Sequence, residues 1–161
     1  FKEEITMNLM EQYHIIPLGN SADFNNGFTA ESINTKNIHG ILFLLSYGAV
    51  GGAGAAALTV KSGNADGVQT TAETFYSRYS NAAQAAATGD TWTAWTSQTT
   101  LSVATATITT RAQQVYIDCS TLTNGQPWLT LALDGTADSG IVHGFAICIP
   151  RYAGNAILTA I

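Results

Sequence analysis

Charged side chains are scarce in this 161-residue sequence. They make up 11% of the residues, against about 25% in an average soluble domain. Six Lys and Arg stand against eleven Asp and Glu, which gives a formal net charge of -5, and the basic residues form no cluster. Because a surface that follows nucleic-acid phosphates needs such a cluster, we predict that nucleic acid is not a partner.

Long apolar runs are also missing. Runs such as residues 41–45 fall far short of the roughly 20 apolar residues that a membrane-spanning helix needs. The opening residues 1–4 are acidic and lack the apolar stretch of a secretory signal. We therefore predict no membrane association. The length and the 46% hydrophobic content predict one globular domain rather than a disordered chain.

Cysteine is limited to Cys119 and Cys148. Both lie in apolar segments, and neither has a Cys or His at the spacing of metal ligands. We predict buried free thiols that pack as small hydrophobic side chains. A disulfide between neighbouring strands stays open as the second interpretation, ahead of a catalytic thiol.

The chain carries short apolar segments separated by turn residues, which indicates strands. The predicted strands cover residues 38–50, 57–62, 75–79, 91–96, 101–110, 113–119, 128–133 and 141–149. Strands at about 8–12-residue spacing are typical of a sandwich or barrel. The sequence thus predicts an all-β, single-domain antiparallel β-sandwich, jelly-roll-like, spanning residues 14–161. Residues 1–13 are predicted to form an N-terminal arm or short helix.

Alternation within these strands predicts the core. The residues expected to be buried are Leu129, Leu131, Leu133, Val115, Ile117, Phe145 and Ile147. Two segments fit a strand less well. Residues 70–73 match a helix capping box, although we favour a strand at 75–79 followed by a loop or helical turn through the alanines. Residues 51–54 are rich in glycine and predict a hairpin loop, since no helix follows to complete a dinucleotide site.

No arrangement of side chains in the sequence predicts an enzyme, a cofactor or a metal site. His14, His39 and His143 are each embedded in apolar sequence, so we expect core or interface histidines. Asp134 and Asp138 lie in a polar loop, where two carboxylates are weak evidence for calcium. The loop also lacks the apolar residues that precede the catalytic Asp of aspartic proteases, and no serine nucleophile motif is present.

Aromatic and apolar residues outside the core pattern predict an interface. Trp92 and Trp95 are three apart, so on a regular strand their rings point to opposite faces and at most one faces the core. Trp128 has the opposite parity to the leucines of its strand. The arm carries Ile5, Leu9 and Tyr13 at near-helical spacing. The candidate interface residues are therefore Ile5, Leu9, Tyr13, Trp92, Trp95 and Trp128.

The scarcity of charge also predicts assembly. Residues 79–110 contain a single charged residue, Asp90, and are mostly Thr, Ala, Ser and Trp. Isolated β proteins guard exposed strand edges with charge, proline or bulges. A domain with few such residues is safer when neighbouring subunits cover its edges. A monomer with threonine-coated faces stays open as the alternative, because threonine forms strands and is soluble.

Several segments resemble small structural proteins of tailed bacteriophages and prophages. They are MNLMEQYHIIP at 7–17, GDTWTAWT at 89–96, QVYID at 114–118 and IPRYA at 149–153. The resemblance spans about Met7 to Ala153, and residues 1–6 precede the usual start of such sequences. It implies a non-enzymatic virion component on a β-sandwich or jelly-roll scaffold, most of all a capsid decoration (head auxiliary) protein.

The resemblance also implies partners and a location. The partner would be the major capsid protein, and the chain would form a homo-oligomer, with trimers at local three-fold positions favoured. The location would be the capsid exterior, after synthesis in the host cytoplasm. Two alternatives stay open: a carbohydrate-binding β-sandwich that uses the tryptophans as sugar platforms, and a tail or connector component of the virion.

Overall fold

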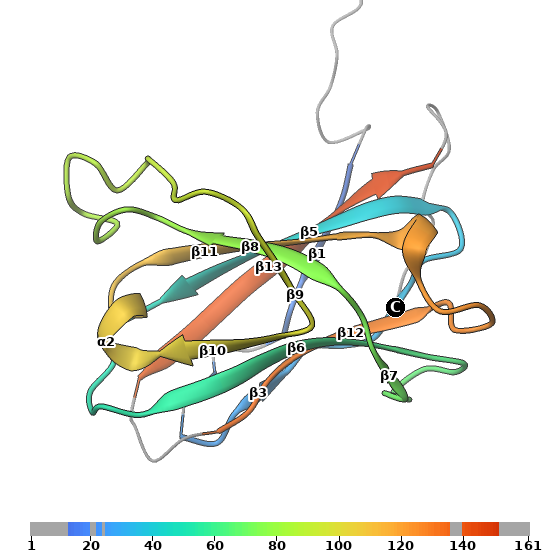
Figure 1. Cartoon of the computed structure of the whole chain (residues 1–161), viewed down its shortest axis with the longest axis horizontal. Helices are drawn as coiled ribbons and strands as arrows, with labels where there is room; N and C mark the ends of the chain where they lie inside the picture. The colour runs from blue at the N-terminus through green and yellow to red at the C-terminus, as the bar shows by residue number, and fades with distance from the viewer. Residues whose placement is uncertain (1–12, 20–21, 24, 136–139, 152–161) are drawn as a thin grey trace, which may run out of the picture.

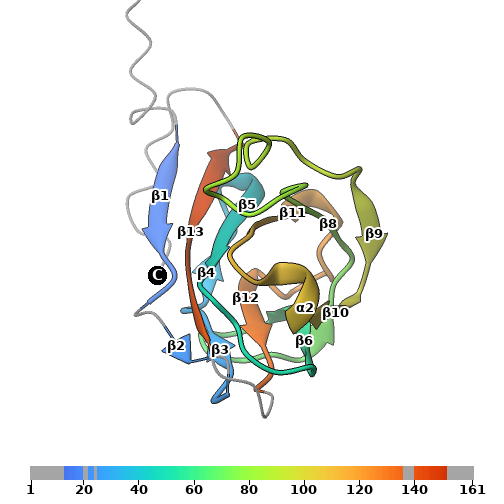
Figure 2. The same cartoon turned by 90° about the vertical axis from the view of Figure 1, so that its left-hand side faces the viewer.

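The computed structural model describes residues 13–19, 22–23, 25–135 and 140–151. These residues form two antiparallel sheets packed face to face, so the predicted all-β sandwich is confirmed (Figure 1). In the described part of the chain, two single turns of helix accompany the sheets: α2 (Thr105–Ile108) and the 3-10 turn η1 (Cys119–Thr121). Figure 2 shows α2 at one open end of the sandwich, between the edges of the two sheets.

Seven strands form the larger sheet. Its order is β1 (His14–Pro17), β13 (Ile141–Pro150), β5 (Ile38–Tyr47), β11 (Ala112–Asp118), β8 (Phe75–Tyr79) and β9 (Thr96–Gln98), with β2 (Ala22–Asp23) also paired to β13. The six-stranded sheet has the order β10 (Thr100–Ala104), β6 (Ala55–Gly63), β12 (Trp128–Leu133) and β3 (Phe28–Thr29). In that sheet β4 (Ile33–Asn34) pairs with β12, and β7 (Thr71–Ala72) pairs with β6.

The strand order is that of a jelly roll. Eight strands carry it: β1, β3, β5, β6, β10, β11, β12 and β13. The first pairs with the last, the second with the seventh, the third with the sixth and the fourth with the fifth, as in a long hairpin rolled into two sheets. Strands β8 and β9 extend the larger sheet beyond β11.

The core lies between the sheets and is filled by alternate residues of their strands. Val115, Ile117, Leu129, Leu131 and Leu133 are buried, as predicted. The prediction was wrong for Phe145, which is 48% exposed, and Ile147 is only half-buried. The reason is that β13 carries apolar residues on both faces, and its smaller residues face inward.

The smaller residues of β13 face the core because large side chains of β5 already fill the space between the two sheets. Val142, Gly144, Ala146 and Cys148 are buried, opposite a neighbouring strand β5 that contributes Phe43 and Tyr47. A Cβ added at Gly144 would lie 2.3 Å from the backbone oxygen of Leu44, so no larger residue fits there. The bulky residues of β13 are therefore directed outward.

Three local predictions were also wrong. The predicted strand at 91–96 is absent, because residues 93–95 are not in a strand and β9 covers Thr96–Gln98. The capping-box match at residues 70–73, which we did not favour, begins no helix: Thr71–Ala72 is the strand β7, and the buried Glu73 accepts hydrogen bonds from the Ser62 hydroxyl and the Thr123 backbone N–H. The predicted strand at 101–110 ends at Ala104, where α2 begins. The glycine-rich residues 51–54 join β5 to β6, which lie in different sheets, so they form a crossover rather than a hairpin.

Tertiary hydrogen bonds explain the helical turn. The buried Thr105 hydroxyl lies 3.0 Å from the carbonyl oxygen of Gly54 and 3.3 Å from that of Gly52. The crossover thus fastens the first residue of α2, and this contact overrides the strand propensity of a Thr-rich sequence. The predicted strand at 75–79 is confirmed as β8, and the alanine-rich residues after it form turns.

The two cysteines are free buried thiols, as predicted. Cys148 lies on β13 and Cys119 directly follows β11, with β5 between these two strands. Strands two apart in a sheet are separated by roughly 9–10 Å, beyond the ~7 Å that a disulfide tolerates between Cα atoms. Burial raises the pKa of both thiols to about 12.

We expect neither thiol to react in the folded protein. A thiol reagent at pH 8 should modify neither cysteine until denaturant unfolds the chain, and the melting temperature should be the same with and without reductant. Because the folded-state pKa is raised from 9.0 to about 12, stability should decline as the pH rises between these values. A large loss of melting temperature on reduction would instead reveal a structural disulfide.

Candidate interaction surface

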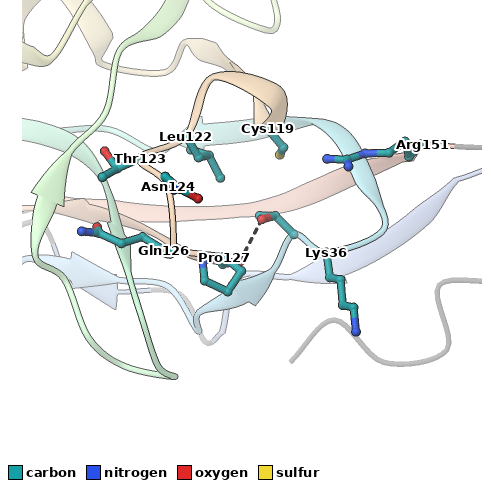
Figure 3. A pocket seen from close by; sticks show the side chains of 10 residues that line it. Lys36, Cys119, Leu122, Thr123, Asn124, Gln126, Pro127 and Arg151 are labelled. Atoms are coloured by element: carbon teal, nitrogen blue, oxygen red, sulfur yellow. Dashed lines mark hydrogen bonds between the residues drawn. The ribbon is translucent and has the colours of Figure 1, made fainter.

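A polar pocket lies beside η1, and its charged side chains do not converge on one point. It has a volume of about 320 Å³ and is bordered by Lys36, Cys119 and Arg151 (Figure 3). The Thr35 hydroxyl donates to the Pro127 carbonyl across it at 2.8 Å. In Figure 3 the Lys36 and Arg151 side chains point in different directions, so the two cations do not define one anion site.

Titratable side chains in the described part of the chain do not gather into a metal site. No group of three or more His, Cys, Asp or Glu residues lies close enough there to hold an ion. His39 and His143 are exposed, His14 is half-buried and Asp134 is exposed, while Asp138 lies outside the described residues. None of the three histidines is therefore a core residue.

The outer face of the seven-stranded sheet is the most distinctive surface. One row of side chains crosses five strands in direct register, from β1 to β8: Ile15, Ile147, Leu42, Tyr116 and Tyr76. Ile15 is 40% exposed and Tyr76 46% exposed, and the three between them are half-buried. A second row beside it contains Phe145 and Leu44. We call these seven residues the outer apolar face.

Two shallow hollows lie on this face. One of about 290 Å³ is bordered by Tyr13, Ile15, Leu42, Ile147 and Ile149. The other, of about 280 Å³, lies among Leu44, Phe145, His143 and Trp92. Both are lined mainly by apolar atoms, which suits them to side chains of a protein partner.

Trp92 and Trp95 lie at the β8 edge of this face and share one partner. The guanidinium carbon of Arg78 is 5.3 Å from the centroid of the Trp92 ring and 4.4 Å from that of Trp95. The Arg78 Nε also donates to Gln114 Oε1 at 2.6 Å. The two rings do not point to opposite faces as predicted, because residues 93–95 are not a regular strand.

The remaining candidate interface residues divide between other places. Trp128 is half-buried on β12, in the other sheet, so it does not join Trp92 and Trp95. Tyr13 is half-buried and borders the first hollow of the outer apolar face. Ile5 and Leu9 lie outside the described residues.

The outer face carries little charge. Among the outward residues of β1, β13, β5, β11 and β8, the formal charges are those of Arg78 and Asp118. Hydrogen bonds from Ser120, with smaller contributions from His39 and Arg151, hold the pKa of Asp118 below its ordinary value, so this carboxylate is ionised at neutral pH. The two charges balance.

Sequence reasoning missed this face, although the sequence contains its signal. Residues 38–45 and 141–149 are apolar at both parities instead of alternating with polar residues. A strand that is apolar on both sides is covered on both sides, by its own domain or by another molecule.

Comparisons with protein-family models, with curated proteins and with solved structures found no match to this chain. Within the described ranges, no helix combines the length and the hydropathy needed to cross a membrane.

Proposed function

We propose that this chain is a non-enzymatic virion structural protein of a tailed bacteriophage, acting as a capsid decoration protein on the exterior of the head. The observation that carries the proposal is a charge-poor jelly roll with a broad, partly exposed apolar face on one sheet. Such a face belongs in contact with other protein. Jelly rolls recur in viral capsid proteins and in lectins, so the fold alone does not decide between them.

Two further points support a virion role. Segments along most of the chain resemble phage structural proteins, and the described residues bring together no cluster of side chains that could hold a metal ion. The partner would be the major capsid protein, with the chain synthesised in the host cytoplasm. It would bind as a homo-oligomer, with trimers favoured.

The mechanism follows from linkage. A protein that binds the assembled head and not its free subunits stabilises the head by mass action. Several docking surfaces in one oligomer raise the avidity well above that of a single contact. No bond is made or broken, so the whole effect depends on buried surface.

The carbohydrate-binding alternative has less support from the tryptophans. Trp128 lies in a different sheet from Trp92 and Trp95, so the three rings form no common platform. One face of Trp92 and one of Trp95 are occupied by Arg78. A tail or connector position would use the same apolar face and is separated from a head position by the experiment below.

The test is binding to phage heads assembled without this protein. We expect saturable binding and a higher temperature of head disruption after addition of the purified chain. A variant that lacks residues 1–12 should fold normally and bind more weakly, if the arm contributes to the contact as the sequence predicts.

Three results would contradict the proposal. They are an absence of binding to heads, recovery of the protein in isolated tails only, and quenching of tryptophan fluorescence by a glycan that competes with the heads. Unchanged head occupancy after the deletion would remove the arm from the interface.

A further inference from the structure

We infer that the outer apolar face is the interface between copies of this chain. The inference rests on the proposed assembly function. It identifies a second copy of the chain as the partner that covers this face. The face is built on five strands whose outward side chains stand in register, so it is a rigid surface rather than a set of loops. Rigid, pre-formed surfaces lose little entropy when they associate.

The outward side of these strands is large enough to form the centre of an interface. Five strands spaced at about 4.8 Å cover roughly 19 Å, and the strands have four to ten residues, so their mean length is roughly 24 Å. The product, on the order of 450 Å² before side-chain relief is counted, is more than half of the ~800 Å² that each partner contributes to a standard interface. A second copy can therefore cover the face fully.

Its charge favours a copy of itself as the occupant. The chain as a whole carries a net charge of -5, so two copies repel one another over most of their surfaces. The outward residues of the five strands instead carry one cation, Arg78, and one anion, Asp118. This neutral region is where two copies approach without repulsion.

Its relief suits self-association as well. Phe145 is 48% exposed and Ile15 is 40% exposed, and each borders one of the two hollows. Projections and hollows on the same surface can interlock when two copies are related by a symmetry axis. Trp92 and Trp95 lie with Arg78 at the border of this face. Trp and Arg are among the residue types that most often anchor protein interfaces.

The experiment measures the mass of the purified chain in solution by light scattering and sedimentation. We expect an oligomer that dissociates on dilution. Phe145→Glu and Leu42→Glu each place a charge in the middle of the face, and both should raise the dissociation constant at least tenfold. Thr59→Glu is the matched control, since Thr59 is a half-buried residue on a strand of the other sheet, and it should leave the oligomer intact.

Folding is monitored separately. Phe145 is substantially exposed, so its substitution should preserve the circular dichroism spectrum and the cooperative melt even if Leu42→Glu does not. As a second readout, Trp92 borders the hollow beside Phe145, so dissociation should shift the tryptophan emission to longer wavelength.

Three outcomes would overturn the inference. The first is a wild-type chain that stays monomeric at concentrations of roughly 100 μM, a weak limit for a specific interface. The second is an oligomer that survives folded Phe145→Glu. The third is a monomer whose face binds a synthetic peptide of residues 1–12 after deletion of that segment, which would make the chain's own arm the occupant. No heads are used, so this test can fail while head binding succeeds, and the reverse.

Discussion

Leu131→Ala is expected to destabilise the fold by about 2–5 kcal/mol, from lost apolar burial and the cavity that remains. Leu131 has no exposed surface and lies on β12, in register with the fully buried Val60 of β6. A loss of this size is a large share of the ~5–15 kcal/mol that holds a typical domain together. Chemical denaturation followed by circular dichroism measures it.

The matched control is Leu101→Ala, which removes the same atoms from a side chain that is only partly buried at the edge strand β10. It should cost clearly less, because part of that side chain is already in contact with water. Wild-type stability of Leu131→Ala, or equal losses for the two variants, would contradict the assignment of Leu131 to the centre of the core.

Gly63→Ala is expected to cost at least as much as the upper end of the ~1–3 kcal/mol usual for overpacking. A Cβ at Gly63 would lie 1.9 Å from the carbonyl oxygen of Val68 and 2.6 Å from its carbonyl carbon. Both are backbone atoms, so a rotamer change cannot relieve the clash. The turn after β6 would have to move, disturbing the hydrogen bonds of the neighbouring Ser62 and Glu73.

Gly48→Ala is the control for a glycine substitution without a clash. A Cβ there would find its nearest atom, the Ile141 backbone oxygen, at 3.6 Å, which is ordinary contact. Its effect should be small and can be slightly stabilising, because alanine restricts the unfolded chain. If thermal melts show Gly63→Ala to be as harmless as Gly48→Ala, the described path of the 63–68 turn is wrong.

Much of the fold can be predicted from this sequence because its period-two patterns are clear. Strands β6 and β11 alternate, and the side chains buried in them are those that alternation selects. In β12 alternation selects the three buried leucines, but Thr130 and Ala132 on the opposite face are buried as well. The pattern fails for β13, where both parities are apolar and the choice of the inward face depends on the space left by β5. It also fails at α2, where contacts with residues distant in sequence decide the conformation.

The interaction surface was less predictable for a related reason. Parity predicts the directions of the Trp92 and Trp95 rings only for a regular strand. Residues 93–95 are not in a strand, and both rings contact Arg78. The row from Ile15 to Tyr76 joins five segments that lie far apart in sequence, and strand order has to be known before they can be placed side by side.

The internal position of β13 in its sheet has a consequence for biosynthesis. Strand β13 lies between β1 and β5, and β1 and β2 pair with no other described strand. More than 120 residues must be translated before β1 meets its partner, so the sheet cannot be completed while the C-terminal part of the chain is still in the ribosomal tunnel. Folding dominated by such distant pairings is slow, in the range of milliseconds to seconds. During that interval the apolar strand β5 has one edge unpaired, so we expect the nascent chain to bind chaperones. The time that folding takes also sets the shortest interval between synthesis and assembly.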